Sequence, residues 1–435
     1  MKTRLGLGLL IVALVIAFFA IPAQATNGMY LTAYGAEAAG RGGANLAISD
    51  RTLAINFNPA GISQLQGRHY SVNLSLLMPE LQTSNLVNPA TDGEDAVFPL
   101  PAFAYVRGGK ESPWSWGFGF IAQGGMGAEF QNLNTFFGTQ DRIFSEVRFM
   151  TLAPTVAYAI NEDMSLGATL NVGYGDVAFE FYPGTSFFNA KNPQMSFFGL
   201  EMDDPAYGLQ TNLRLGYLWQ FHPRASVGVI YQTETESNFE NGSMIVNFEG
   251  HPFLGRKVSY DVDVDGFTFA SQAGLGFAFR PTEKVVLAVD LKLYDWDSAI
   301  DTITVSATNP DTQGAPPVTV PFIFNWEEQW VYALGIDYRM NDRVTLRAGY
   351  NFGENPVPDG TLNPLFPANV EDHFTLGFGY LHNNKTYNFG FEYVPEFEQT
   401  NNNANPMVNP FGPQSMVGHE QMTLSFGVSW AKARH

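Results

Sequence analysis

The chain has 435 residues, no cysteine and a formal net charge of −19, and only 15% of its residues are charged while 14% are aromatic. The absence of cysteine excludes disulfides and thiolate chemistry, and the acidic balance excludes a nucleic-acid partner, because phosphate binding requires lysine and arginine. Soluble globular chains carry about 25% charged residues, so the surface of this protein is expected to be poor in charge.

The first 25 residues have the features of a secretory signal peptide. Lys2 and Arg4 form a basic start, residues 5–21 are apolar, and residues 23–25 read A-Q-A, a cleavage site of the A-x-A type. A membrane-anchor helix is the alternative, but a good membrane span needs about 20 apolar residues. We therefore predict that residues 1–25 are a cleaved signal peptide and that the protein is exported.

Residues 26–67 are rich in small side chains and fit neither a clean helix nor a clean strand. They contain Asn58-Pro59-Ala60-Gly61, which has the chemistry of a tight turn: asparagine opens turns, proline fixes φ, and glycine permits positive φ. Residues 40–43 read G-R-G-G but lack the ending of a phosphate-binding loop. A free periplasmic tail is one interpretation, but the apolar residues 53–55 require burial. We predict a plug, or hatch, over residues 26–67.

From residue 68 onward, polar and apolar residues alternate with the period of a β-strand. In residues 422–430, for example, Met, Leu, Phe, Val and Trp occupy one face while Thr, Ser and Gly occupy the other. A soluble sandwich would also alternate. However, the polar face carries arginine, lysine and aspartate in mid-strand, and aromatic residues gather near strand ends, as in the girdles of membrane barrels. Closure into a barrel leaves no unpaired edge in lipid.

The turns give the expected number of strands. Short and long connections alternate, as expected for periplasmic turns and external loops. The sequence thus predicts an all-β, 14-stranded antiparallel transmembrane β-barrel over residues 68–435, with the plug in its lumen. The fourteen strands are expected to begin near residues 68, 97, 113, 145, 164, 207, 224, 262, 284, 326, 343, 371, 386 and 420.

Two of the long loops, residues 176–206 and 237–261, are rich in aromatic residues. Either these loops bury small cores of their own, or they form an external apolar groove that collects hydrophobic ligands, since ligand pockets are mostly apolar. The candidate ligand-binding aromatics are Phe187, Phe188, Phe197, Phe198 and Phe248.

Two segments resemble the FadL/TodX family of outer-membrane transport proteins. These are residues 35–63, G-A-E-A-A-G-R-G-G-A-N-L-A-I-S-D…N-F-N-P-A-G-I-S, and residues 330–359, which contain L-R-A-G-Y and P-V-P-D. The resemblance extends over essentially the whole mature chain and implies a fourteen-stranded barrel with an N-terminal hatch. It also implies passive uptake of long-chain fatty acids or other hydrophobic compounds. The last five residues, 431–435, depart from a usual barrel terminus because they follow the terminal aromatic Trp430.

The resemblance further implies a kinked third strand that opens a lateral portal, with the hatch motif Asn58-Pro59-Ala60-Gly61 near the kink. The matching strand begins at Trp114, and Gly124, Gly125 and Gly127 fall where the kink is expected. Glycine in mid-strand weakens pairing and often marks a bulge.

Three cations, Arg214, Lys292 and Arg347, lie in mid-strand on the polar face. A carboxylate ligand needs a cation or N–H donors where water is scarce, so these residues are candidates for ligand binding or hatch docking. The alternative is that each pairs with an acid such as Asp290. The scattered histidines and the lack of a nucleophile motif predict no enzyme activity, no metal site and no cofactor.

Two functions follow as hypotheses. The first is ligand-gated uptake of long-chain fatty acids, or of aromatic or aliphatic hydrocarbons, by a monomer in the bacterial outer membrane that delivers its ligand sideways into the lipid. The second is a general porin or a structural barrel. A porin needs an open polar channel, and the expected plug and apolar loops argue against one.

Overall fold

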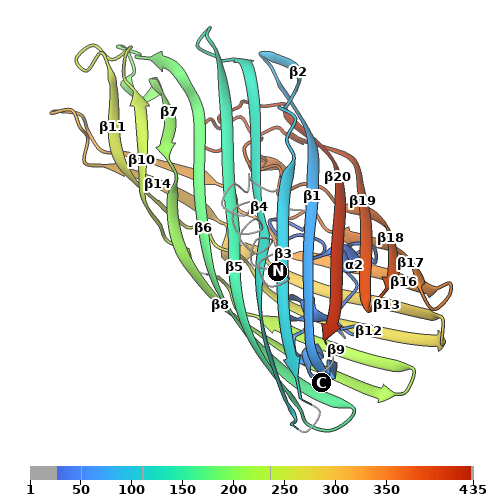
Figure 1. Ribbon diagram of the computed structural model, residues 1–435. Helices are drawn as coiled ribbons and strands as arrows, with labels where there is room; N and C mark the ends of the chain where they lie inside the picture. Colours follow the sequence, from blue (N-terminus) through green and yellow to red (C-terminus); the bar gives the residue numbers. More distant parts are fainter. Residues whose placement is uncertain (1–26, 50, 110–111, 236, 433–435) are drawn as a thin grey trace.

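The computed structural model describes residues 27–49, 51–109, 112–235 and 237–432. The predicted signal peptide lies outside these residues. Within the described ranges, no helix has the length and apolar character needed to cross a membrane. The chain forms one large antiparallel sheet whose long strands curve around an enclosed N-terminal segment (Figure 1).

The helical elements are short. They are α2 (Ala36–Ala39), η1 (Thr52–Asn56), η2 (Pro59–Gln64), η3 (Pro193–Met195), α3 (Trp296–Ala299) and η4 (Asp359–Thr361). The strands are β1 (Gly67–Asn85), β2 (Asn88–Asp92), β3 (Phe98–Gly108), β4 (Trp114–Asn134), β5 (Gln140–Ala159), β6 (Met164–Phe187), β7 (Phe197–Asp204), β8 (Ala206–His222), β9 (Ala225–Gln232), β10 (Phe239–Asn247), β11 (Lys257–Asp265), β12 (Ser271–Thr282), β13 (Val285–Asp295), β14 (Thr302–Thr308), β15 (Val318–Ile323), β16 (Gln329–Arg339), β17 (Val344–Gly353), β18 (Asp372–His382), β19 (Lys385–Asn401) and β20 (Ser415–Lys432).

The sheet closes on itself because its first strand pairs with its last. The β1–β20 pairing runs from Arg68 opposite Lys432 to Ser84 opposite Met416 without interruption. All the strand pairs around the ring are antiparallel, and β6 and β8 pair directly over their turn-side halves. Closure leaves no unpaired edge along this seam, as a sheet in lipid requires.

The expected number of fourteen strands is wrong. The closed barrel has sixteen strands, and four further strands, β2, β11, β14 and β15, lie outside it. The ring gains β7 and β10, because β6 pairs with β7, β7 pairs with β10, and β10 meets β8 through Glu240 and Tyr207. Both strands fall in segments that the sequence predicted to be loops. β10 reads F-E-N-G-S-M-I-V-N, which lacks the alternation by which strands between lipid and lumen are recognised.

The two faces of the barrel differ as the alternation predicts. Exposed leucine, valine and aromatic side chains cover the outer face, for example Leu166, Leu213 and Leu334. At the short-turn end, Trp430 stacks on Tyr70 with ring centroids 5.3 Å apart, and Tyr70 in turn lies 5.0 Å from Tyr105. Such a row of aromatic rings is typical of the boundary between hydrocarbon and lipid headgroups.

Residues 27–49 and 51–66 lie inside the barrel and contact strands on several sides of it. The Oγ1 of Thr32 donates to Glu392 on β19, Arg41 pairs with Asp337 on β16, and Ser165 on β6 donates to the Ala60 carbonyl. Glycines allow the close approach: a Cβ at Gly43, where φ is +76°, would lie 2.2 Å from the Thr32 carbonyl oxygen. We call residues 27–49 and 51–66 the N-terminal segment.

Candidate functional site

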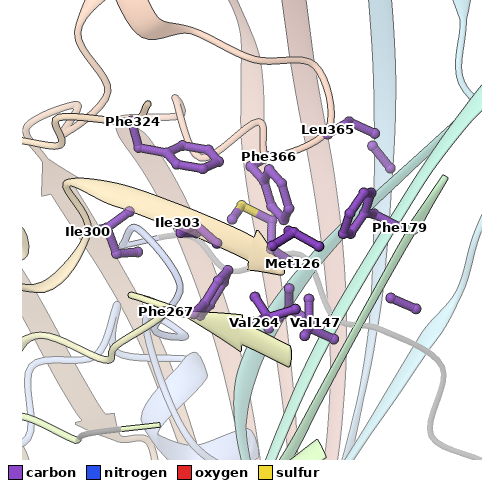
Figure 2. Close-up of a cluster of buried hydrophobic side chains, with 14 of the residues drawn as sticks. Met126, Val147, Phe179, Val264, Phe267, Ile300, Ile303, Phe324, Leu365 and Phe366 are labelled. Carbon is purple, nitrogen blue, oxygen red and sulfur yellow. The ribbon is translucent and has the colours of Figure 1, made fainter. Parts of the chain in front are cut away.

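A large cluster of buried apolar side chains fills the long-loop half of the interior. Met126, Phe149, Phe267 and Trp296 belong to it, and it continues down to Tyr30 of the N-terminal segment. Figure 2 shows part of it, where Phe267 and Phe324 lie beside Phe366, and the three residues come from loops that are distant in the sequence. We call this group the interior apolar cluster. Its surface offers an apolar solute an environment without water.

A small cavity of about 20 Å³ lies where the interior apolar cluster meets the N-terminal segment. Two of the predicted cations, Arg214 on β8 and Lys292 on β13, share this cavity with the tyrosines Tyr30, Tyr34 and Tyr294. The sequence placed these cations on the polar face, but it gave no sign that they would meet. The cavity therefore places two cationic side chains beside Tyr30 and Tyr294 of the interior apolar cluster.

Arg214 is buried against neutral partners. Its Nε and Nη2 donate to the Oε1 of Gln232 at 2.8 and 2.5 Å, and the Nε2 of Gln232 donates to the Tyr30 hydroxyl at 2.9 Å. Among the residues that the structure describes, no carboxylate lies within ion-pair distance of this guanidinium. Burying a charge without a counter-charge is costly, so Arg214 is suited to an anionic ligand.

Lys292 and Asp290 hold the N-terminal segment from neighbouring positions on β13. The Nζ of Lys292 donates to the Gly43 carbonyl at 3.2 Å. The Oδ2 of Asp290 accepts the backbone N–H groups of Asn45 and Leu46 at 2.7 and 3.0 Å. Lys292 thus makes a contact of the kind that hatch docking, the alternative role of the lumen cations, requires.

Arg347, the third predicted cation, lies in a separate ion-pair network. It contacts Glu37 at 3.3 Å and Asp337 at 3.5 Å, and Arg41 bonds the same Asp337 at 2.9 Å. Burial opposes ionisation of Glu37, but the nearby Arg51, Arg347 and Arg41 hold the pKa of this carboxyl well below its usual range. Arg347 is therefore already neutralised by side chains of the protein, unlike Arg214.

The strand that carries the predicted kink, β4, contains a bulge at the expected position. Ala122 pairs with Met150 and Gly124 with Phe149, which leaves Gln123 without a partner in β5. Gly124 and Gly125 have φ of +146° and +157°, which side-chain-bearing residues rarely adopt. Before the bulge the even-numbered side chains of β4 face outward, and after the extra residue they face inward. Met126, Ala128 and Phe130 therefore join the interior apolar cluster.

The bulge is tied to the N-terminal segment. The side-chain amide of Gln123 exchanges hydrogen bonds with that of Asn56, and the Tyr34 hydroxyl donates to the Gln123 carbonyl at 2.8 Å. Tyr30 forms an isolated β-bridge with Gly124. On the opposite side, β4 pairs with β3 only from Trp116 to Ile121. The two strands therefore separate at the bulge.

The predicted hatch motif packs against β6 and β8. Asn58 caps η2 by accepting the Ala60 N–H, and its Nδ2 donates to the carbonyls of Leu46 and Tyr217. Pro59 lies against two glycines, where a Cβ at Gly167 or Gly216 would come within 2.3 or 2.8 Å of it. The residues that meet Gly124 are instead Met29 and Tyr30. Turn chemistry predicts a local shape but not the surface on which the turn packs.

Replacing Pro59 with leucine is expected to reduce uptake of hydrophobic compounds while the barrel still assembles. The larger, flexible side chain cannot fit against Gly167 and Gly216, so η2 must move and the N-terminal segment with it. Heat-dependent gel mobility would report assembly, and uptake by cells would report transport. Ser63→Leu, on the same element but less buried, is the control. Normal uptake by the Pro59→Leu variant would show that the motif is an ordinary turn that transport does not require.

The aromatic residues proposed from the long loops gather beyond the barrel rim. Phe187 and Phe197 both stack on Phe137, at 5.2 and 4.8 Å, while Phe198 lies 4.7 Å from Phe248 and Phe188 lies 5.1 Å from His251. Phe187 is 40% exposed, whereas Phe248 is buried. Phe248 belongs to the interior apolar cluster and Phe197 and Phe198 pack against it, so these loops extend that cluster, and their role in ligand capture stays a prediction.

Several residues of the interior were not predicted from the sequence. Tyr30, Gln232, Phe267 and Trp296 were not singled out, although Phe267 and Phe269 alternate as strand residues do. Phe267 and Phe269, like Met126 and Phe130, are apolar at positions where a water-filled lumen predicts polar side chains, and this departure could have identified them.

A second, larger chamber of about 1660 Å³ lies at the short-turn end, lined by Glu37, Arg41 and Arg347 among others.

Comparison with known proteins gives one family and several solved structures. The family described as "Outer membrane protein transport protein (OMPP1/FadL/TodX)" matches residues 16–428. The toluene transporter TodX of Pseudomonas putida is similar over 93% of this chain and 100% of its own, with a TM-score of 0.75 and 16% identity. A Pseudomonas aeruginosa FadL homologue covers 93% and 99%, with a TM-score of 0.74 and 15% identity. The Ralstonia pickettii toluene transporter TbuX covers 92% and 99%, with a TM-score of 0.72 and 16% identity. At these identities the likeness is one of fold. No curated protein matches the sequence.

Proposed function

Because the chain belongs to the outer membrane protein transport family (OMPP1/FadL/TodX), we propose that it takes up long-chain fatty acids or similar anionic amphiphiles by passive, ligand-gated diffusion. The observation that carries this proposal is the buried Arg214, which has only neutral partners and lies beside Lys292 below the interior apolar cluster. A chain with a carboxylate at one end matches both environments at once.

The binding energy of such a ligand has two parts. Its hydrocarbon chain would leave water for the interior apolar cluster and gain about 25 cal/mol per Å² of apolar surface removed from water. Its carboxylate would accept charge-assisted hydrogen bonds from Arg214 and Lys292, which are stronger than neutral ones. The carboxylate would also supply the counter-charge that Arg214 lacks.

The proposed gating depends on the hydrogen bond that Lys292 donates to the Gly43 carbonyl. A carboxylate on Lys292 competes with the Gly43 carbonyl, so binding weakens one anchor of the N-terminal segment. The same segment contacts the β4 bulge through Tyr30, Tyr34 and Asn56. We propose that ligand binding shifts these contacts and that the ligand leaves through the separation between β3 and β4 into the bilayer.

Uptake of neutral hydrocarbons is the second candidate, and the aromatic character of the interior favours it. Phe149 and Phe269 meet edge to face at 3.9 Å, and Tyr30 stacks on Tyr294 at 5.2 Å. Such a lining accepts aromatic rings without any cation. Two of the similar solved structures are described as toluene transporters, and another as a monoaromatic hydrocarbon channel.

The two candidates separate in an uptake assay with Arg214→Gln. We expect oleate uptake to fall roughly 10- to 100-fold, since a hydrogen bond to a charged group contributes about 1.5–3 kcal/mol, while toluene uptake is unchanged. Arg343→Gln, a cation at a short turn, is the control. Equal loss for oleate and toluene would contradict the carboxylate site, and toluene uptake without oleate uptake in the unaltered protein would favour the hydrocarbon. Free flux of small sugars into liposomes would identify a porin instead.

A further inference from the structure

Three cations form a row across adjacent strands at the short-turn end of the barrel. Arg68 on β1 lies directly opposite Lys432 on β20 and directly opposite Arg107 on β3. Two residues further along each strand, in the same register, lie Tyr70, Trp430 and Tyr105. Because side chains two residues apart share a face, the three cations occupy the outward positions of their strands, as these aromatic rings do, at the rim of the short-turn chamber whose lining also includes them.

This row is unfavourable for the protein by itself. Like charges directly opposite each other on neighbouring strands repel, and here the same charge occurs on three strands in succession. None of the three has an ion-pair partner among the described residues, in contrast to Arg142 and Arg148, which contact Glu180 and Asp176 at 2.5 and 2.7 Å. The repulsion in the row would be relieved by an anion from outside the chain.

On the surface next to the row, charged, aromatic and apolar side chains follow one another toward the membrane centre. Immediately toward the membrane centre lies the row of aromatic rings, in which Phe118, opposite Tyr105 on β4, continues the series at 5.7 Å from Tyr105. Beyond it come apolar side chains at the next outward positions, Val428, Val72 and Phe103. Charge, aromatic rings and hydrocarbon therefore follow one another in the order of phosphate, glycerol region and acyl chains.

We propose that Arg68, Arg107 and Lys432 bind the phosphate of an anionic phospholipid in the inner leaflet of the outer membrane. Arginine matches phosphate with paired N–H donors, and short turns of such barrels face the periplasm, which places the row at inner-leaflet headgroups. A soluble acidic partner fits less well, because the cations adjoin lipid-facing rings. The site lies on the outer face of the barrel and goes beyond the proposed transport function.

The test is lipid binding to the full chain, purified in mild detergent and measured by native mass spectrometry with phosphatidylglycerol and with phosphatidylcholine. We expect retention of phosphatidylglycerol over phosphatidylcholine, and at least a tenfold loss of that preference in the triple variant Arg68→Gln, Arg107→Gln, Lys432→Gln. The matched control removes the same charge at the long-loop end: Lys191→Gln, Arg256→Gln, Lys257→Gln. A lysine version of the arginine positions, Arg68→Lys with Arg107→Lys, should keep most of the preference.

Three results would overturn the proposal. One is equal retention of phosphatidylglycerol by the triple variant and the unaltered protein. Another is an equal loss of preference in the control. The third is displacement of the lipid by millimolar inorganic phosphate, which would identify a site for free anions. Heat-dependent gel mobility, measured in parallel, confirms that each variant is an assembled barrel, and a single-site variant, Arg68→Gln, replaces the triple variant if assembly fails.

Discussion

Replacing Asp290 with leucine is expected to turn a closed barrel into one that leaks small polar solutes. Asp290 accepts the N–H groups of Asn45 and Leu46, and an unsatisfied buried donor costs about 1–3 kcal/mol. Leucine leaves both donors unsatisfied and removes the negative charge beside Lys292. Attachment of the N-terminal segment to β13 should therefore weaken by roughly 2–6 kcal/mol, enough to populate states in which the lumen is open.

Single-channel conductance and liposome swelling with small sugars would measure this leak. Asp263→Leu is a matched control, because Asp263 is exposed on β11, outside the barrel ring. Asp290→Asn should leak less than Asp290→Leu, since its amide oxygen still accepts hydrogen bonds. A tight Asp290→Leu barrel would mean that the other contacts, such as Arg41 with Asp337, hold the N-terminal segment without this carboxylate.

Replacing Gly124 with valine is expected to abolish uptake of hydrophobic compounds while the barrel still assembles. Gly124 has φ of +146°, and a Cβ there would lie 2.2 Å from the Met29 carbonyl oxygen. A β-branched residue cannot adopt that backbone conformation without strain. Either the bulge is lost, or the N-terminal segment is displaced from it. Both outcomes disturb the place where β3 and β4 separate.

Uptake of labelled oleate and of toluene would both be measured, because the prediction concerns the exit route and not the ligand. Gly360→Val provides the control, since a Cβ at that external position meets nothing closer than 3.9 Å. Unchanged uptake by an assembled Gly124→Val barrel would contradict lateral exit at this strand. Loss of toluene and oleate together would distinguish this variant from Arg214→Gln, which should affect the acid alone.

The regular strands were the predictable part of this fold. Strands expected near residues 68, 164 and 284 begin at Gly67, Met164 and Val285, because lipid outside and polar side chains inside impose strict alternation. β7 and β10 were missed because they extend beyond that two-sided environment, where both faces can be apolar. The number of strands was therefore wrong even though these strand starts were close.

The candidate site was predictable by residue type but not by partner. Arg214 and Arg347 look alike in the sequence, since each is an arginine in mid-strand on a polar face. The difference lies in the partners that the fold places beside each. Arg214 meets Gln232 of β9 and, through it, Tyr30 of the N-terminal segment, whereas Arg347 meets Asp337 of β16 and Glu37 of the N-terminal segment. Such partners are more than a hundred residues apart in several cases, and no local pattern encodes them.

The unpaired Gln123 amounts to a single extra codon in the strand that lines the opening between β3 and β4. Deleting that codon would restore continuous pairing with β5 and leave Met126 and Phe130 facing the lumen, because their partners Val147 and Ile143 would be unchanged. The same edit would remove the side chain that bonds Asn56. One insertion event could thus have supplied both the opening in the wall and its link to the interior, so a related barrel without this residue should keep a sealed wall.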